Sequence, residues 1–256
     1  MVARLRAAGC VFAEEEARLL TEAARTPADL EAMVGQREKG LPLEQVVGWA
    51  DFCGLRILVD PWVFVPRPRS EFLVATAVSL AGGASPVIVD LCCGTGALGL
   101  AVAARLAAAR PAAGLHAADI DPVAVGCARR NVEPAGGRVY QGDLFAPLPA
   151  ELRGRVTVLI CNAPYVPTGD IALLPPEARD YEPRTALDGG SDGLAVLRRA
   201  AAEAPRWLAP GGVLLVETSD PQAPLMTRVM TAAGLTGRVH RCAEYESTVV
   251  TGTAPG

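Results

Sequence analysis

The run Val87-Ile88-Val89-Asp90-Leu91 is followed by Cys92-Cys93-Gly94-Thr95-Gly96 and then by an alanine-rich segment that extends to residue 110. The first run is apolar except for its acid and rich in β-branched side chains, which predicts a buried strand. The glycines predict a tight turn, and residues 97–110 predict a helix. This order is typical of nucleotide binding, because glycines let the ligand approach the backbone and the helix N-terminus offers free N–H groups.

The turn differs from the three-glycine fingerprint of dinucleotide-binding proteins. Gly94, Gly96 and Gly99 have its spacing, but the run begins two residues too late after the strand. The carboxylate of Asp90 would also repel a pyrophosphate. A ligand with an ammonium group, such as the methionyl part of S-adenosylmethionine, suits this turn better. The residues that we expect to contact this cofactor here are Asp90, Cys92, Cys93, Gly94, Thr95 and Gly96.

Two further predicted strands end in acidic residues. The strand over residues 114–118 ends at Asp119, which we expect to accept hydrogen bonds from both ribose hydroxyls of the cofactor. A helix N-cap is the alternative role, although Asp121 fills it more naturally just before Pro122. The strand over 139–145 carries Asp143 and Leu144, which we expect at the adenine, the acid on its amine and the apolar side chain against its ring.

Asn162-Ala163-Pro164-Tyr165 follows a predicted buried strand over residues 156–161. The side-chain oxygen of Asn162 and the carbonyl of Ala163, whose direction Pro164 restricts, can hold both hydrogens of a planar NH2 group. The ring of Tyr165 can pack against the π face of that group. The four residues therefore predict a catalytic and substrate-binding site for an amide or an aromatic amine. An ordinary Asn-x-Pro turn at the end of a strand is the alternative.

Strands and helices alternate along the rest of the chain, which predicts an α/β fold with a doubly wound, seven-stranded, mostly parallel sheet. Further strands are expected near residues 213–217, 237–240 and 248–251, and helices over 122–131, 192–207 and 222–233. We expect residues 166–188 to form an irregular and functional loop. Within it, Arg184 either anchors a substrate carbonyl or pairs with Glu177 or Glu182.

The N-terminal part has a different pattern. Residues 1–40 predict a small helical appendage, with a helix over 14–25 and another that starts at Thr26 as N-cap. Residues 41–71 predict a β-hairpin linker with short strands at 46–49, 55–59 and 63–65. A helix begins near Ser70. Residues 72–256 would then form the main α/β domain.

Composition excludes several classes of protein. The net charge is −4 with no long basic run, which argues against stable nucleic-acid binding. Seven cysteines without a C-x-x-C pair predict reduced thiols, and the scarcity of histidine, with only His116 and His240, argues against a metal centre. Without a signal peptide or a bilayer-length apolar run, we expect a cytoplasmic protein without membrane segments.

Together these motifs resemble the class I S-adenosylmethionine methyltransferases and, within them, the release factor glutamine methyltransferase family. The resemblance runs from about residue 41 to residue 252. It rests on the segment 63–68 with Glu71, the glycine turn, the acids after the next strands, the tetrapeptide and residues 182–194, in this order. The chain has Ala163 where the family has proline, and Cys92 where the turn has its first glycine.

The resemblance implies a reaction and a set of site residues. S-adenosylmethionine would be the cofactor and S-adenosylhomocysteine the product, with residues 92–96 on the methionyl part, Asp119 on the ribose and Leu144 beside the adenine. Residues 162–165 would hold the amide of a protein glutamine, in the Gly-Gly-Gln loop of a class I peptide chain release factor. Asn162 would also contact the cofactor. We expect a monomer.

Two other functions remain open from the sequence. The same four residues could also hold the amino group of adenine or guanine in nucleic acid for methylation. The negative net charge of the chain argues against this function. A cofactor-binding scaffold without activity is the third possibility, for which Ala163 and the short N-terminal part are the hints.

Overall fold

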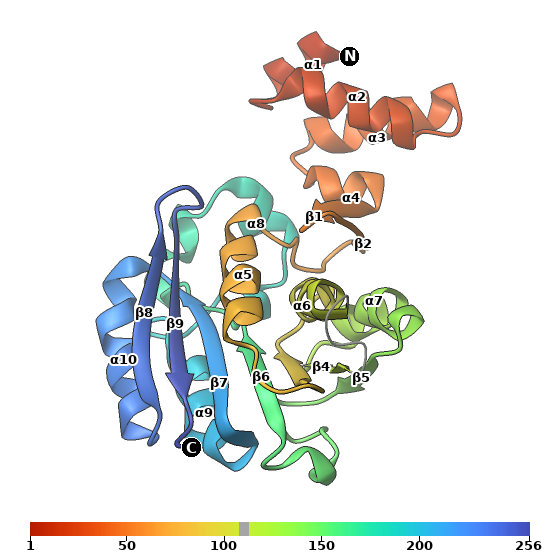
Figure 1. Ribbon diagram of the computed structural model, residues 1–256. Helices are drawn as coiled ribbons and strands as arrows, with labels where there is room; N and C mark the ends of the chain where they lie inside the picture. The colour runs from red at the N-terminus through yellow and green to blue at the C-terminus, as the bar shows by residue number, and fades with distance from the viewer. Residues whose placement is uncertain (108–112) are drawn as a thin grey trace.

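The computed structural model describes residues 1–107 and 113–256. Its centre is a seven-stranded sheet of order β5-β4-β3-β6-β7-β9-β8, in which β9 runs antiparallel to β7 and β8 and the other pairs are parallel (Figure 1). The predicted seven-stranded, mostly parallel sheet is confirmed. Its strands are β3 (Val87–Leu91), β4 (Gly114–Asp119), β5 (Arg138–Gln141), β6 (Val156–Cys161), β7 (Leu208–Thr218), β8 (Thr236–Cys242) and β9 (Ser247–Thr253).

Helices cover both faces of this sheet. Along β3, Ile88 belongs to one buried cluster with residues of α5, α6 and α7, whereas Val89 and Leu91 belong to the opposite cluster with residues of α9 and α10. A strand that is buried on both faces has no polar side to show, so it reads as a nearly continuous apolar run. The covering helices are α5 (Glu71–Leu80), α6 (Ala97–Ala107), α7 (Pro122–Val132), α9 (Ala195–Glu203) and α10 (Ala223–Ala232).

The ends of several predicted elements move by a few residues. The predicted helix over 97–110 is observed to Ala107, and residues 108–110 lie outside the described part of the chain. The helix predicted over 192–207 is observed as the shorter α9 (Ala195–Glu203), and Asp192 and Gly193 belong to the loop before it. Strand β5 ends at Gln141, so Asp143 and Leu144 stand in the loop that follows the strand.

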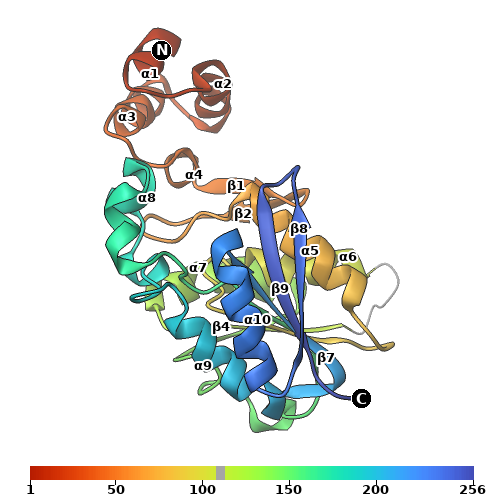
Figure 2. The same ribbon diagram turned by 90° about the vertical axis from the view of Figure 1, so that its left-hand side faces the viewer.

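The N-terminal helices stand at one end of the molecule (Figures 1 and 2). Leu5, Ala17 and Leu20 are buried in their own small core. Thr26 caps α3 as expected, and its hydroxyl accepts the N–H of Asp29 in a reciprocal capping box. The helices of this part are α1 (Val2–Ala7), α2 (Ala13–Ala23), α3 (Pro27–Glu38) and α4 (Leu43–Val47).

Two of the three predicted linker strands are wrong. The first, over residues 46–49, instead contains the last two residues of α4, the C-cap Gly48 with φ +85°, and Trp49, with which β1 begins. The third, over 63–65, forms no strand, because its backbone groups bond to side chains: Gln45 donates to the carbonyl of Val63, and Glu182 accepts the N–H of Val65. The hairpin itself is present as the antiparallel pair β1 (Trp49–Phe52) and β2 (Leu55–Leu58).

The segment 166–188 is more ordered than predicted. It contains α8 (Pro176–Tyr181), flanked by the 3₁₀ turns η4 (Thr168–Leu173) and η5 (Arg184–Ala186). A proline at the first helical position has its φ already set for a helix, which the Pro175-Pro176 pair signals. No helix in the described ranges is long and apolar enough to cross a bilayer.

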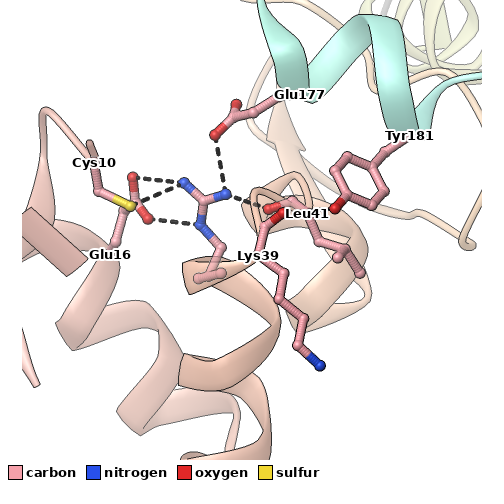
Figure 3. A network of polar contacts seen from close by, with 7 residues as sticks. Cys10, Glu16, Lys39, Leu41, Glu177 and Tyr181 are labelled. Atoms are coloured by element: carbon pink, nitrogen blue, oxygen red, sulfur yellow. Dashed lines mark hydrogen bonds and ion pairs between the residues drawn. The ribbon is translucent and has the colours of Figure 1, made fainter. Parts of the chain in front are cut away.

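A buried arginine joins the N-terminal helices to α8 (Figure 3). Arg37, only 4% exposed, donates to Glu16 at 2.8 Å and pairs with Glu177 of α8 at 3.0 Å. Its guanidinium also donates to the carbonyl of Leu41. Beside it, the hydroxyl of Tyr181 donates to a backbone carbonyl of the α3 C-terminus at 2.6 Å. These contacts hold α8 and the helical appendage in one fixed arrangement.

We predict that Arg37→Ala lowers the free energy of unfolding by about 3 kcal/mol, because it leaves Glu16 without its cation in a mostly buried place. The measurement is a urea unfolding curve followed by circular dichroism. Arg4→Ala is the matched control, since it removes two ion pairs that are largely exposed and should leave the midpoint nearly unchanged. Equal losses for the two variants would contradict the role of Arg37.

Candidate active site

A cavity of about 550 Å³ opens at the carboxyl ends of β3, β4 and β6. Its lining includes Asp90, residues 92–95 of the glycine turn, Asp119 and residues 162–165, whereas Gly96 does not border it. The linker segment 66–70, the start of α8 and residues 245–246 form further parts of its wall. The structure therefore brings the predicted cofactor turn and the predicted substrate tetrapeptide to a single cavity.

The glycine turn has a backbone that side chains rarely adopt. Cys92 has φ +53°, a strained value for a residue with a Cβ, and Gly94 and Gly96 have φ +54° and +77°. A Cβ on Gly99 would lie 2.9 Å from the Cβ of Asp90, so helix α6 reaches the strand only with glycine there. The turn thus brings backbone N–H groups close to the cavity floor.

Asp90 is a buried acid without a cation. It is 1% exposed, and its Oδ2 accepts the N–H of Gly99 at 2.8 Å. Burial raises the pKa of Asp90 to about 7, the charge of Asp119 adds to the shift, and the hydrogen bond from Gly99 opposes it. In the described ranges Asp90 has no ion pair. A cationic group of a ligand would therefore supply the opposite charge that this carboxylate lacks.

Asp119 lies between the glycine turn and the start of α7. Its carboxylate accepts the N–H groups of Gly94 at 2.8 Å and Asp121 at 3.0 Å. Burial raises the pKa of Asp119, while these hydrogen bonds lower it. The N-cap of α7 is Asp121, whose side chain accepts the N–H of Val123 at 2.7 Å. Capping therefore does not explain Asp119, and contact with the ribose stays our prediction.

A second cavity of about 440 Å³ shares Cys92, Asp119 and Pro164 with the first. Leu144, with φ +47°, lies in its wall, as expected for a residue beside the adenine. Asp143 also borders it, but its carboxylate pairs with Arg199 at 2.6 Å. An adenine amine would have to share this carboxylate with the arginine.

No turn or bend falls on residues 162–165, so the alternative of a simple turn is wrong. After β6 the chain runs on to Val166, which forms an isolated parallel bridge with Asp188. Asn162 donates from Nδ2 to Ser70 Oγ at 3.5 Å, while its Oδ1 accepts no hydrogen bond within the described part of the chain. The carbonyl of Ala163 is likewise without a donor there. Both expected acceptors are open.

Two glycines support the tetrapeptide from behind. A Cβ on Gly189 would lie 2.6 Å from the carbonyl oxygen of Pro164, and one on Gly193 would lie 2.2 Å from that of Tyr165. The side chain of Gln222 donates to the carbonyl of Tyr165 at 2.9 Å. Gly189 and Gly193, which belong to the segment 182–194 noted in the sequence, therefore pack closely against the backbone of the tetrapeptide.

Arg184 pairs with Asp188 at 3.2 Å, not with either acid considered from the sequence. Glu177 is paired with Arg37, and Glu182 with Arg67. Arg184 is largely exposed and borders the second cavity, beside the residues expected at the adenine. Contact of Arg184 with a substrate carbonyl stays our prediction.

Three polar residues at the tetrapeptide were missed in the sequence. Glu217 of β7 accepts hydrogen bonds from Ser70 Oγ at 2.7 Å and from the hydroxyl of Tyr165 at 2.8 Å. Arg69 pairs with Glu217 at 3.1 Å and also donates to the Tyr165 hydroxyl. The sequence did contain one indication of these contacts, the single acid Glu217 at the end of the apolar run 213–217. A buried charge needs polar partners, so such an acid predicts them.

The sequence of this chain is similar to those of known methyltransferases. The model of the methyltransferase small domain family matches residues 68–173. A release factor glutamine methyltransferase of Geobacter sulfurreducens is 39% identical over 79% of this chain and 69% of its own length. Its counterpart in Mycolicibacterium smegmatis is 44% identical over 75% and 67%.

One further relative and one solved structure are also similar to this chain. A 4-amino-L-phenylalanine/4-methylamino-L-phenylalanine methyltransferase of Streptomyces pristinaespiralis is 36% identical over 75% of this chain and 66% of its own length. A crystal structure of a methyltransferase from Pyrococcus furiosus has the same fold, with 17% identity, 79% and 90% coverage and a TM-score of 0.54. Because the relatives from Geobacter sulfurreducens and Mycolicibacterium smegmatis are 39% and 44% identical over two thirds or more of their length, the chain belongs to the S-adenosylmethionine-dependent release factor glutamine methyltransferase family.

Proposed function

We propose that this chain methylates the side-chain amide nitrogen, N5, of a glutamine in the Gly-Gly-Gln loop of a class I peptide chain release factor. The observation that carries the proposal is the pair of open acceptors, Asn162 Oδ1 and the carbonyl of Ala163, on a cavity shared with the cofactor turn. The names of the relatives from Geobacter sulfurreducens and Mycolicibacterium smegmatis support the same substrate.

The residues of the cavity suit S-adenosylmethionine. Asp90 offers a negative charge to an ammonium group, and Asp119, which lies next to the backbone of the turn, would accept hydrogen bonds from a ribose. Leu144 offers an apolar wall at the second cavity. When bound, the cofactor supplies an electrophilic methyl group on a positively charged sulfur.

An amide nitrogen is a weak nucleophile, because its lone pair is delocalised into the carbonyl. Hydrogen bonds from its two N–H groups to Asn162 and Ala163 would orient the nitrogen and favour a pyramidal geometry. Transfer would form the new N–C bond while the S–C bond of the cofactor broke, with the bonding electron pair left on sulfur. The amide proton can leave for water once the nitrogen is cationic. Alignment and electrostatics therefore supply most of the rate enhancement.

The N-terminal part is our candidate for gripping the release factor. We assign residues 1–40 to a docking appendage, 41–71 to a linker and 72–256 to the catalytic domain. Arg37 supports this assignment, because it ties the appendage to α8, whose Glu177 and Ala178 border the cavity. We further propose that the enzyme acts as a monomer in the cytoplasm, and that Arg184 contacts the substrate.

A second candidate reaction is methylation of an aromatic amine on a free amino acid. It is favoured by the name of the Streptomyces pristinaespiralis relative and by the tetrapeptide, since an arylamine also presents a planar NH2 group. The release factor relatives are more similar, at 39–44% identity, so protein glutamine is our first choice.

Labelled S-adenosylmethionine distinguishes these acceptors. We predict that label enters a class I release factor and is lost when the glutamine of its Gly-Gly-Gln loop is changed to alanine. Free 4-aminophenylalanine and ribosomal RNA serve as parallel acceptors. Label in the amino acid alone would favour the second candidate, and label in RNA alone would refute both.

Asn162→Ala should abolish most of the transfer. Removing the side-chain acceptor misplaces the nitrogen, so we expect the rate at saturating substrate to fall by roughly 10² or more. Binding of S-adenosylmethionine, measured by calorimetry, should stay within about twofold, since the turn and Asp119 are untouched. Transfer at the wild-type rate would rule out the assignment of Asn162.

Cofactor affinity should depend on pH through Asp90. With a folded pKa of about 7, this group is protonated at low pH and offers no negative charge to an ammonium. We predict that the Kd for S-adenosylmethionine rises as pH falls from 8 to 5.5, by calorimetry. Asp90→Asn should bind weakly and lose this dependence. A wild-type Kd that is flat across the range would disprove the ion pair.

A further inference from the structure

Glu217 is a carboxylate in the interior of the central sheet that the proposed chemistry does not yet use. It is 2% exposed on β7, where it lies opposite Val249 of β9. Burying a carboxylate is costly unless donors surround it. Its donors come from segments far apart in the chain, Ser70 at the entry to α5 and Tyr165 after β6.

The carboxylate fixes the direction of each hydrogen bond around it. An ionised carboxylate only accepts, so both hydroxyls must donate to it, Ser70 to Oε2 and Tyr165 to Oε1. Burial and the charge of Glu217 raise the pKa of Tyr165 well above its usual value, which keeps the phenol protonated. Arg69, over the ring of Tyr165 at 5.6 Å, balances the charge.

The direction of the Ser70 hydrogen bond also determines how the amide of Asn162 is oriented. The single proton of Ser70 is committed to Glu217, so its oxygen can only accept from a further neighbour. Nδ2 of Asn162 is that neighbour, at 3.5 Å. The reversed amide would place Oδ1 against an oxygen that has no proton left to give. The arrangement thus leaves Oδ1 for the substrate.

We propose that Glu217 and Ser70 are positioning residues, which hold the amide of Asn162 and the ring of Tyr165 in the orientation that receives an NH2 group. The chain of contacts runs from Asn162 Nδ2 to Ser70 Oγ, to the carboxylate of Glu217, and to the hydroxyl of Tyr165. The consequence for methyl transfer rests on the proposed function. The orientation of Asn162 does not.

Two substitutions disrupt this series of hydrogen bonds in different ways. Ser70→Ala removes the link between Asn162 and Glu217. Glu217→Gln keeps the shape but introduces a donor, so that one of the two hydroxyls must reverse its bond. Ser79→Ala is the matched control, because Ser79 is an exposed serine of α5 that bonds only to the backbone. Ser70→Thr restores the hydroxyl.

The first readout needs no methyl acceptor. The side-chain NH2 signals of Asn162, identified by their loss in Asn162→Ala, are followed by NMR in the ¹⁵N-labelled full chain. We expect them to shift or broaden in Ser70→Ala and Glu217→Gln, and to stay in place in Ser79→Ala. Unchanged signals in both of the first two variants would overturn the proposal, whether or not a release factor is methylated.

The second readout is methyl transfer to a class I release factor. We expect kcat to fall by about 10- to 100-fold in Ser70→Ala and Glu217→Gln, with the Kd for S-adenosylmethionine within about twofold. Ser70→Thr should recover most of kcat. A wild-type chain that leaves the release factor unlabelled, while the NMR signals move, would reject the proposed substrate and support the positioning role. Transfer by both variants at the wild-type kcat would reject the role.

Discussion

The register of three parallel strands is the constraint on which the site depends. Leu91 of β3 lies opposite both Ala118 of β4 and Cys161 of β6. The next residue on each strand therefore starts a site segment at the same level: the glycine turn, Asp119 and the tetrapeptide. Neighbouring strands are about 4.8 Å apart. A shift of one residue would turn every side chain of a strand to the opposite face, so the two buried clusters that fix the register also fix the site.

Residues far from the strand ends then hold the tetrapeptide in place. Gly189 and Gly193 permit the backbone behind it to approach, and Glu217 ties Tyr165 to the linker. Arg37 in turn joins the N-terminal helices to Glu177 of α8, which borders the cavity. The cavity itself is lined by the linker and by the domain that follows it, and Asn162 and Ala163 line it together with residues 92–95 of the glycine turn. Alanine at position 163 keeps the carbonyl on which this geometry relies.

Much of this was predictable, because strand ends and their acids are local features. Buried runs such as 87–91 predicted the sheet, and the residues that follow them predicted the cavity. The linker strands at 46–49 and 63–65 were predicted wrongly, since apolar β-branched residues there fill a core without pairing. The bond between Ser70 and Glu217 spans 147 residues, so no local pattern encodes it.

The central claim is that two oxygens at the end of β6 receive an NH2 group beside the cofactor. A crystal structure of the chain with S-adenosylhomocysteine and a Gly-Gly-Gln peptide tests it most directly. The account predicts the glutamine nitrogen within about 3.2 Å of both Asn162 Oδ1 and the carbonyl oxygen of Ala163. A peptide whose glutamine lay outside this pair of acceptors, with the cofactor product in place, would contradict it.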